Sequence, residues 1–256
     1  MRYALLIAYD GTDLTGWWRQ AEGRSVAGCL DAAFARLGEP AAAAVGASRT
    51  DAGVHAHGQV AHVDCERPWD VRDLVRSLNR HLPPAVVVRG AVAVDPDFHA
   101  VHVVVAKTYR YAVDLGPVAD PFLARWAWRP PYHLDPARLP ALAARVTAMT
   151  TAAAFARRGD QRDDLSVAIR SCRWHRRGST WIASITADRF TYRLVRSLVG
   201  GMLATAQGTC SDAQWSTALA GEDSPAGQQQ APARGLHLWR VTYPRPLDFT
   251  PSIPRP

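Results

Sequence analysis

The order of strand-like and helix-like patterns in the first half of this chain fits few folds. Residues 3–9 form an apolar run with the length of a buried strand. Ser25 can cap the helix that follows, whose apolar residues recur at helical spacing until Gly38 ends it. The later patterns predict strands at 43–47 and 59–64, a helix at 70–79, and strands at 86–94 and 101–113. This order of strand, helix, strand, strand, helix, strand is that of a split βαβ, ferredoxin-like unit.

A proline-rich stretch at 116–131 leads into a second half with a similar mixture of elements. There the patterns predict a helix at 135–151, strands at 169–175 and 181–187, a helix at 192–206, a short helix after Ser211, a surface loop at 221–235 and a closing strand at 236–243. We therefore expect an α+β protein with two ferredoxin-like halves, whose mostly antiparallel sheet is flanked by helices. The expected domains are 1–116 and 117–245, followed by a proline-rich tail at 246–256.

The charge and the cysteines narrow the class of protein. A net charge of +7 favours a polyanionic partner such as RNA or DNA. No run of about 18 apolar residues predicts a membrane span, and the N-terminal apolar run is too short for a signal peptide. The cysteines are scattered without a CxxC pair, which indicates unpaired thiols in a reducing cytoplasm and disfavours a zinc site.

Residues 49–55, Arg-Thr-Asp-Ala-Gly-Val-His, place Asp51 on a short turn between two apolar runs. One interpretation is an Asx-turn in which Gly53 supplies a positive φ. The other is a nucleophile, because a guanidinium such as that of Arg49 favours the ionised carboxylate and lowers its pKa. His55 and His57 would share one face of a strand, but His62 would lie on the other, so a metal site is disfavoured.

Two further clusters carry aromatic and basic side chains. Tyr109 and Tyr111 would share one face of a strand, either as half-buried core residues or as a stacking platform for a base. Arg196 follows Tyr192 by one helical turn among valines and leucines, so it is either a snorkelling residue or a buried charge that needs a carboxylate. Asp51 is the acid that we expect to pair with it.

Two adjacent tryptophans follow a polar loop near the N-terminus. Trp17 is expected to fill the edge of the core. For Trp18, which precedes Arg19, base stacking and core packing both remain open.

Five segments, taken in order and with their spacing, resemble the TruA family of tRNA pseudouridine synthases over most of the chain. They are Tyr9 to Thr12 with Gly16, Trp17, Arg19 and Gln20; Arg49 to His55 with Gly58 to Val60; Asn79 with Leu82 and Pro83, then Asp97 to Ala100; Lys107 to Tyr111; and Phe190 with Tyr192, Val195, Arg196, Val199 and Gly200. The resemblance implies the pseudouridine synthase fold. It also implies that Asp51 is the nucleophile, that Tyr109 stacks on the target base, that Arg196 pairs with Asp51, and that Arg49, His55 and Tyr192 help to bind substrate.

The same resemblance implies an activity. Members of this family isomerise uridine to pseudouridine at positions 38, 39 and 40 in the anticodon stem-loop of tRNA, as homodimers without a cofactor. The reaction breaks an N-glycosidic bond and makes a C-glycosidic bond between the same fragments, so no redox or group-transfer cofactor is needed. A carboxylate can attack C1′ of the sugar or add to C6 of the base, and the sequence leaves both routes open.

The chain also departs from the family pattern. Ser48 replaces a usual glycine, Val101 an arginine and Trp18 a glutamine, while Arg193 and Leu194 replace a histidine or asparagine and a methionine. The alternatives are therefore a synthase with another RNA target, a non-catalytic RNA-binding protein on the same scaffold, and an N-glycoside hydrolase that releases free base.

Overall fold

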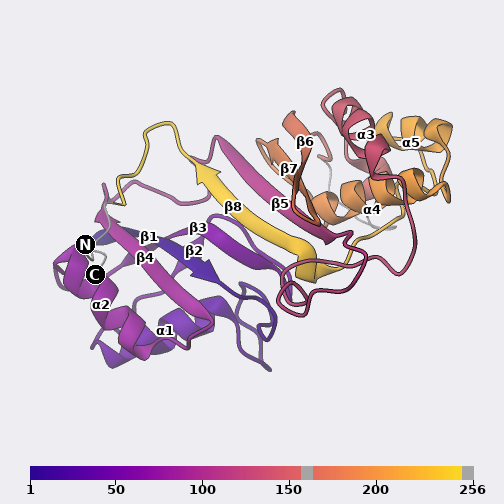
Figure 1. Cartoon of the computed structure of the whole chain (residues 1–256). Helices are drawn as coiled ribbons and strands as arrows, with labels where there is room; N and C mark the ends of the chain where they lie inside the picture. The colour runs from indigo at the N-terminus through magenta and orange to yellow at the C-terminus, as the bar shows by residue number, and fades with distance from the viewer. Residues whose placement is uncertain (157–163, 250–256) are drawn as a thin grey trace. The chain divides into compact units, whose positions relative to one another are not determined.

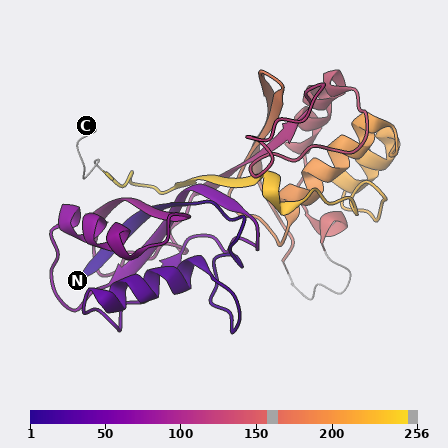
Figure 2. The same ribbon diagram turned by 60° about the horizontal axis from the view of Figure 1, so that its bottom comes forward.

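The computed structural model describes residues 1–156 and 164–249, which form two compact units (Figures 1 and 2). Unit 1 comprises Met1–Val105 and the described residues from His237 onward, and unit 2 comprises Ala106–Leu236. The boundaries predicted at 116 and 245 differ from these and stay a prediction. Most of the predicted tail lies outside the described residues.

The sheet of unit 1 contains five strands, β1 (Arg2–Tyr9), β2 (Val45–Gly46), β3 (His55–Asp64), β4 (Val86–Ala93) and β8 (Leu236–Thr242). The order across it is β4-β1-β3-β8, and the short β2 also pairs with β3. β1 runs antiparallel to both of its neighbours. β8 pairs parallel to the start of β3. The prediction of a mostly antiparallel sheet is thus confirmed.

Two helices, α1 (Val26–Arg36) and α2 (Val71–His81), lie side by side on one face of this sheet (Figure 1). The Ser25 hydroxyl accepts the backbone N–H of Gly28 at the start of α1. The Asp70 carboxylate accepts two backbone N–H groups at the start of α2. Such caps satisfy the donors that a helix start leaves unpaired. The predicted element order and both helix starts are confirmed.

Two strand boundaries in this half differ from the predicted ones. β3 begins at His55 rather than at residue 59, so the Asp51 turn leads directly into a strand. The strand predicted from residue 101 begins at Ala106, as β5 (Ala106–Asp114). Before it, Ala100 N–H donates to Nδ1 of His62 and Val101 N–H to Nδ1 of His99. Because imidazoles take these donors, the valine-rich segment forms turns instead of a ladder.

Unit 2 packs helices on its own antiparallel strands, in which β7 (Thr180–Ala187) lies between β5 and β6 (Ile169–Arg177). Its helices are α3 (Leu139–Val146), α4 (Leu194–Gln207) and α5 (Asp212–Leu219), with 3-10 turns at Pro136–Arg138, Ala153–Phe155 and Ala233–Gly235. α3 packs on β6, and α4 contacts β5, α3 and α5 (Figure 1).

The second half differs from the prediction in three places. The helix predicted at 135–151 stops at Val146, because beyond it Thr150 and Ala152 bond to Val167 and Leu165 through their backbones. α4 starts two residues later than predicted, since Arg193 adopts a left-handed φ of 60°. The loop predicted to lie on the surface at 221–235 is partly buried. Within the described residues, no helix is both long and apolar enough to span a bilayer.

Candidate active site

The Asp51 turn in unit 1 is fixed through the residues on either side of the carboxylate. Thr50 is buried, and its Oγ1 lies 2.7 Å from the Tyr9 hydroxyl. The Gln59 amide spans Ser48, accepting its N–H at 3.2 Å and donating to its carbonyl oxygen at 2.6 Å. Asp51 itself is half-buried. Its backbone is thus positioned by strands β1 and β3, while its side chain remains partly accessible.

Close backbone approach fixes the turn from the other side. The 11–17 loop packs on it so tightly that a Cβ on Gly11 would lie 2.1 Å from the carbonyl oxygen of Val54. A Cβ on Gly16, where φ is +99°, would lie 2.6 Å from the carbonyl oxygen of Thr50. Trp17 N–H donates to that same carbonyl at 3.0 Å. Only glycine fits at these two positions, so the 11–17 loop and the turn form one rigid piece.

Trp17 and Trp18 lie in different environments. Trp17 is 1% exposed, which confirms the core prediction. Trp18 is exposed, and the guanidinium of Arg49 lies 4.5 Å from its ring centroid. A stacked guanidinium keeps its donors at the rim of the site.

The serine at position 48 imposes no left-handed strain on the turn, because Arg193 is the one non-glycine residue of positive φ in the described chain.

His55 is buried beneath the turn. Its Nδ1 accepts the backbone N–H of Gly11 at 3.1 Å and lies 3.2 Å from Oδ1 of Asp10. Its ring stacks on His237 at 4.7 Å, and the His57 ring lies 5.3 Å from the same His237. His55 therefore supports the Gly11 loop against the turn. No group of three or more histidine, cysteine, aspartate or glutamate side chains in residues 1–156 and 164–249 could hold a metal ion.

The tyrosines on β5 have distinct environments. Tyr109 is 7% exposed, and its ring meets Phe190 edge to face at 5.1 Å. Tyr111 is fully buried and donates its hydroxyl to the carbonyl oxygen of Pro232 at 2.7 Å, and burial raises its pKa. Tyr111 is thus a structural residue, which leaves Tyr109 as the candidate stacking ring.

Arg196 lies near the start of α4, where it joins the helix to the loop before β8. Its Nε donates to the carbonyl oxygen of Ala231 at 2.8 Å and its Nη2 to Oε1 of Gln230 at 3.3 Å. The backbone N–H of Ala231 returns a bond to the carbonyl oxygen of Arg196 at 3.0 Å. Tyr192 is exposed, and the guanidinium of Arg193 lies 4.6 Å from its ring centroid. The predicted pairing of Arg196 with Asp51 joins the two units and stays a prediction.

Sequence reasoning missed several residues that build this site. Gln59 was expected only as a strand residue, yet its amide clamps Ser48. His237 and Gln230 were not singled out, although they contact His55 and Arg196. The one sequence signal is a glutamine within an apolar strand pattern. The structure buries Gln59 completely, and a buried amide needs partners.

The chain is similar to known proteins along nearly all of its length. A family model described as tRNA pseudouridine synthase matches residues 151–244. The tRNA pseudouridine synthase A of a Picosynechococcus species is 36% identical over 255 residues, which cover 98% of this chain and 92% of that protein. That of a Roseiflexus species is 38% identical over 248 residues, covering 94% and 90%. That of Methylobacterium nodulans is 35% identical over 253 residues, covering 98% and 99%.

Proposed function

The chain belongs to the tRNA pseudouridine synthase A family, and from that premise we propose that it isomerises uridine to pseudouridine in tRNA, at positions 38, 39 and 40 of the anticodon stem-loop, with Asp51 as the nucleophile. The observation that carries this proposal is the half-buried carboxylate on a turn locked by Thr50, Ser48 and two glycines that admit no side chain. A group held this rigidly forfeits little freedom when it reacts, which favours catalysis.

The proposed reaction balances without any further reagent. The N1–C1′ bond of uridine breaks, the base turns and a C5–C1′ bond forms, while C5 loses its proton to solvent and N1 takes up one proton from solvent. An ionised carboxylate serves either route, because it can attack C1′ of the sugar or add to C6 of the base. In both routes the uridine must first leave the base stack, at a cost of about a few kcal/mol.

The remaining residues receive roles in binding the displaced uridine. We assign Tyr109 to stacking on the uracil ring and to assisting loss of the C5 proton, and Arg196 to pairing with Asp51. Arg49, held over Trp18, would occupy the place of the displaced nucleotide. His55 supports the loop beneath Asp51, and Tyr192 offers an exposed ring to RNA.

The net charge and the family suggest how the protein binds tRNA, its oligomeric state and its location in the cell. A net charge of +7 suits the phosphates of tRNA, and each phosphate contact releases counterions. We therefore expect the affinity for tRNA to fall steeply as salt is added. Like the family that it resembles in sequence, the chain is proposed to act as a homodimer in the cytoplasm.

The test compares wild type with Asp51→Ala on tRNA transcripts that carry tritium at C5 of uridine. We expect tritium release only from wild type, with pseudouridine mapped to the anticodon stem-loop. Asp97→Ala is the matched control, since it removes an exposed carboxylate from the same unit and should retain full release. Turnover by Asp51→Ala would remove Asp51 from the mechanism.

The same assay separates the alternatives. Free uracil among the products would indicate an N-glycoside hydrolase. Tritium release with pseudouridine outside the anticodon stem-loop would indicate another target. RNA binding without any release by wild type would indicate a non-catalytic binder.

A further inference from the structure

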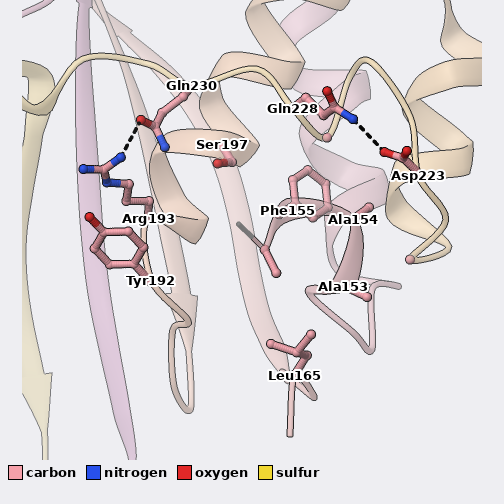
Figure 3. A pocket seen from close by; sticks show the side chains of 13 residues that line it. Ala153, Ala154, Phe155, Leu165, Tyr192, Arg193, Ser197, Asp223, Gln228 and Gln230 are labelled. Carbon is pink, nitrogen blue, oxygen red and sulfur yellow. Dashed lines mark hydrogen bonds between the residues drawn. The ribbon is translucent and has the colours of Figure 1, made fainter. Parts of the chain in front are cut away.

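Unit 2 contains a cavity at the start of α4 (Figure 3). Its volume of ≈ 840 Å³ lies within the range of about 300–1,000 Å³ that is usual for small-ligand sites. Tyr192, Arg193 and Ser197 line one side together with Gln230, and Phe155 and Asp223 lie on the others. All of these residues belong to unit 2.

One end of the cavity is positively charged. Nη1 of Arg193 lies 3.4 Å from Oε1 of Gln230, while its guanidinium covers the Tyr192 ring. The φ of Arg193 is 60°, which costs energy for a residue with a Cβ and persists only where the surroundings hold it. α4 has no acidic side chain in its first turn and no side-chain cap, so its N-terminal dipole is not neutralised locally. This end suits a phosphate.

Ser197 supplies an independent indication of a ligand. It lines the cavity at 4% exposure, and within the described part of the chain its hydroxyl has no hydrogen-bond partner. Its oxygen is not fully enclosed by protein, so the hydroxyl opens onto the cavity, where a bound group can reach it. The Ser197 hydroxyl therefore gives the cavity a hydrogen-bond donor and acceptor that no protein group uses.

The rest of the lining suits a planar base. Tyr192 is 39% exposed and offers a ring face, and Phe155 and Leu165 add apolar surface. Beyond them, Nε2 of Gln228 donates to Oδ1 of Asp223 at 2.7 Å, which places amide and carboxylate atoms where the edge of a base could reach them. An anion site next to a ring face and polar edge groups matches the chemistry of a nucleotide.

Building on the proposed function, we propose that this cavity is a second nucleotide site. It holds one unpaired nucleotide of the RNA other than the uridine that reacts. The phosphate lies at Arg193 and the start of α4, the base lies against Tyr192, and Ser197 bonds to the bound nucleotide.

Ser197→Ala provides the first test. Because the hydroxyl has no protein partner, its loss should leave the melting temperature unchanged or raise it, since alanine favours a helix. The KM for tRNA in the tritium-release assay should rise about fivefold, as expected for one lost hydrogen bond. Ser77→Ala on α2 is the matched control and should change neither value. An unchanged KM in Ser197→Ala would overturn the proposal, and a lowered melting temperature would assign the hydroxyl a structural role.

A fluorescent base locates the nucleotide. Each unpaired anticodon-loop position except the reacting uridine is replaced in turn by 2-aminopurine, whose emission is quenched on stacking. Quenching at one position is expected with wild type and with Arg176→Asn, an exposed arginine elsewhere in unit 2. It should be lost with Tyr192→Leu, whose KM should rise about tenfold from the loss of one base stack. The absence of quenching at every position, or quenching that survives in Tyr192→Leu, would contradict the second site.

Two further outcomes keep the proposals apart. Failure of wild type to release tritium would reject the proposed isomerisation. Normal release with unaffected Ser197→Ala and Tyr192→Leu would reject the second site and the RNA-binding role of Tyr192, and would leave the isomerisation standing. Equilibrium dialysis with uridine and adenosine 5′-monophosphates tests a free ligand. Saturable binding in the absence of RNA that Tyr192→Leu abolishes would assign the cavity to a free mononucleotide and overturn the RNA assignment.

Discussion

The Asp51 turn and the start of α4 hold their functional groups in different ways. The turn is held by backbone packed against backbone at Gly11 and Gly16, with the hydroxyl of Tyr9 locking Thr50. The start of α4 is held by side chains, because Arg193 and Arg196 both reach Gln230. It also contains the one left-handed non-glycine residue of the described chain.

This difference follows from what each region is proposed to do. A nucleophile needs one position, and glycine-tight packing provides it because no side chain can move aside. A surface that receives RNA has to adapt to a large partner, and long side chains can change their conformation on binding. We therefore expect substitutions near the turn to abolish activity and substitutions near α4 to change affinity.

The largest effect is expected for Gly11→Ala. The added Cβ would overlap the carbonyl oxygen of Val54, so the turn or the loop must shift. We expect unfolding by urea to become easier by at least about 3 kcal/mol and activity to fall at least about 100-fold. Gly38→Ala is the control, because its φ is also unfavourable but nothing lies within 4 Å of the added Cβ, and it should cost about 1 kcal/mol. Equal losses in the two variants would refute the packing argument.

Acid should weaken unit 1 more than unit 2, through His62. Burial lowers the pKa of His62 from 6.5 to about 4, with His99, Arg2 and His102 adding repulsion and Asp64 opposing it. The unfolded chain therefore takes up a proton first as the pH falls. Stability is complete above pH 6.5 and is lost between pH 6.5 and about 4, by up to about 3 kcal/mol.

Urea unfolding across this pH range would measure the effect. His62→Gln should reduce the pH dependence of stability, and a smaller part should remain because burial also lowers the pKa of His99 and of His175. His133→Gln, at an exposed position in unit 2, should leave it as in wild type. A slope that is as steep in His62→Gln as in wild type would assign the acid sensitivity to other groups.

Tyr9→Phe and Tyr3→Phe separate position from stability within one strand. Each substitution removes a tyrosine hydroxyl that forms a hydrogen bond within unit 1. The Tyr9 hydroxyl bonds to Thr50, and the Tyr3 hydroxyl bonds to Trp69. Both should cost about 1 kcal/mol in urea unfolding. Only Tyr9→Phe should also slow single-turnover tritium release, by about tenfold, since only Thr50 adjoins Asp51. Equal rates in the two variants would mean that the Thr50 contact does not position the turn.

The sequence predicts those parts of the fold that local patterns determine. The cap at Ser25, the short helix after Ser211 and the turn at Asp51 follow from residue type and spacing, and the structure confirms them. The strand predicted from residue 101 was wrong in its first residues because His62 and His99, the first of them distant in the chain, take the backbone donors. Local periodicity contains no information about such partners.

The same limit applies to the candidate site. Asp51 is a candidate because of its flanking residues, and Arg196 because of its apolar setting on a helix, and both roles stay predictions. The Gln59 clamp and the Gln230 contacts could not, because each joins segments 11 or more residues apart. The left-handed Arg193 was hidden as well, because nothing in the sequence distinguishes it from the first residue of a regular helix turn.

The smallest effect is expected for Arg193→Asn, and its sign is opposite to the others. Asparagine tolerates a left-handed φ better than arginine, so the variant should be more stable, by up to about 1 kcal/mol in urea unfolding. Its KM for tRNA should nevertheless rise, because the guanidinium over Tyr192 is lost. Arg193→Lys keeps the charge and the unfavourable φ, so it should gain no stability and lose less affinity. If the unfavourable φ of Arg193 is retained because the arginine binds tRNA, the asparagine variant should gain stability and lose affinity. An asparagine variant that is no more stable, or that binds tRNA as well as wild type, would show that the left-handed arginine serves neither role.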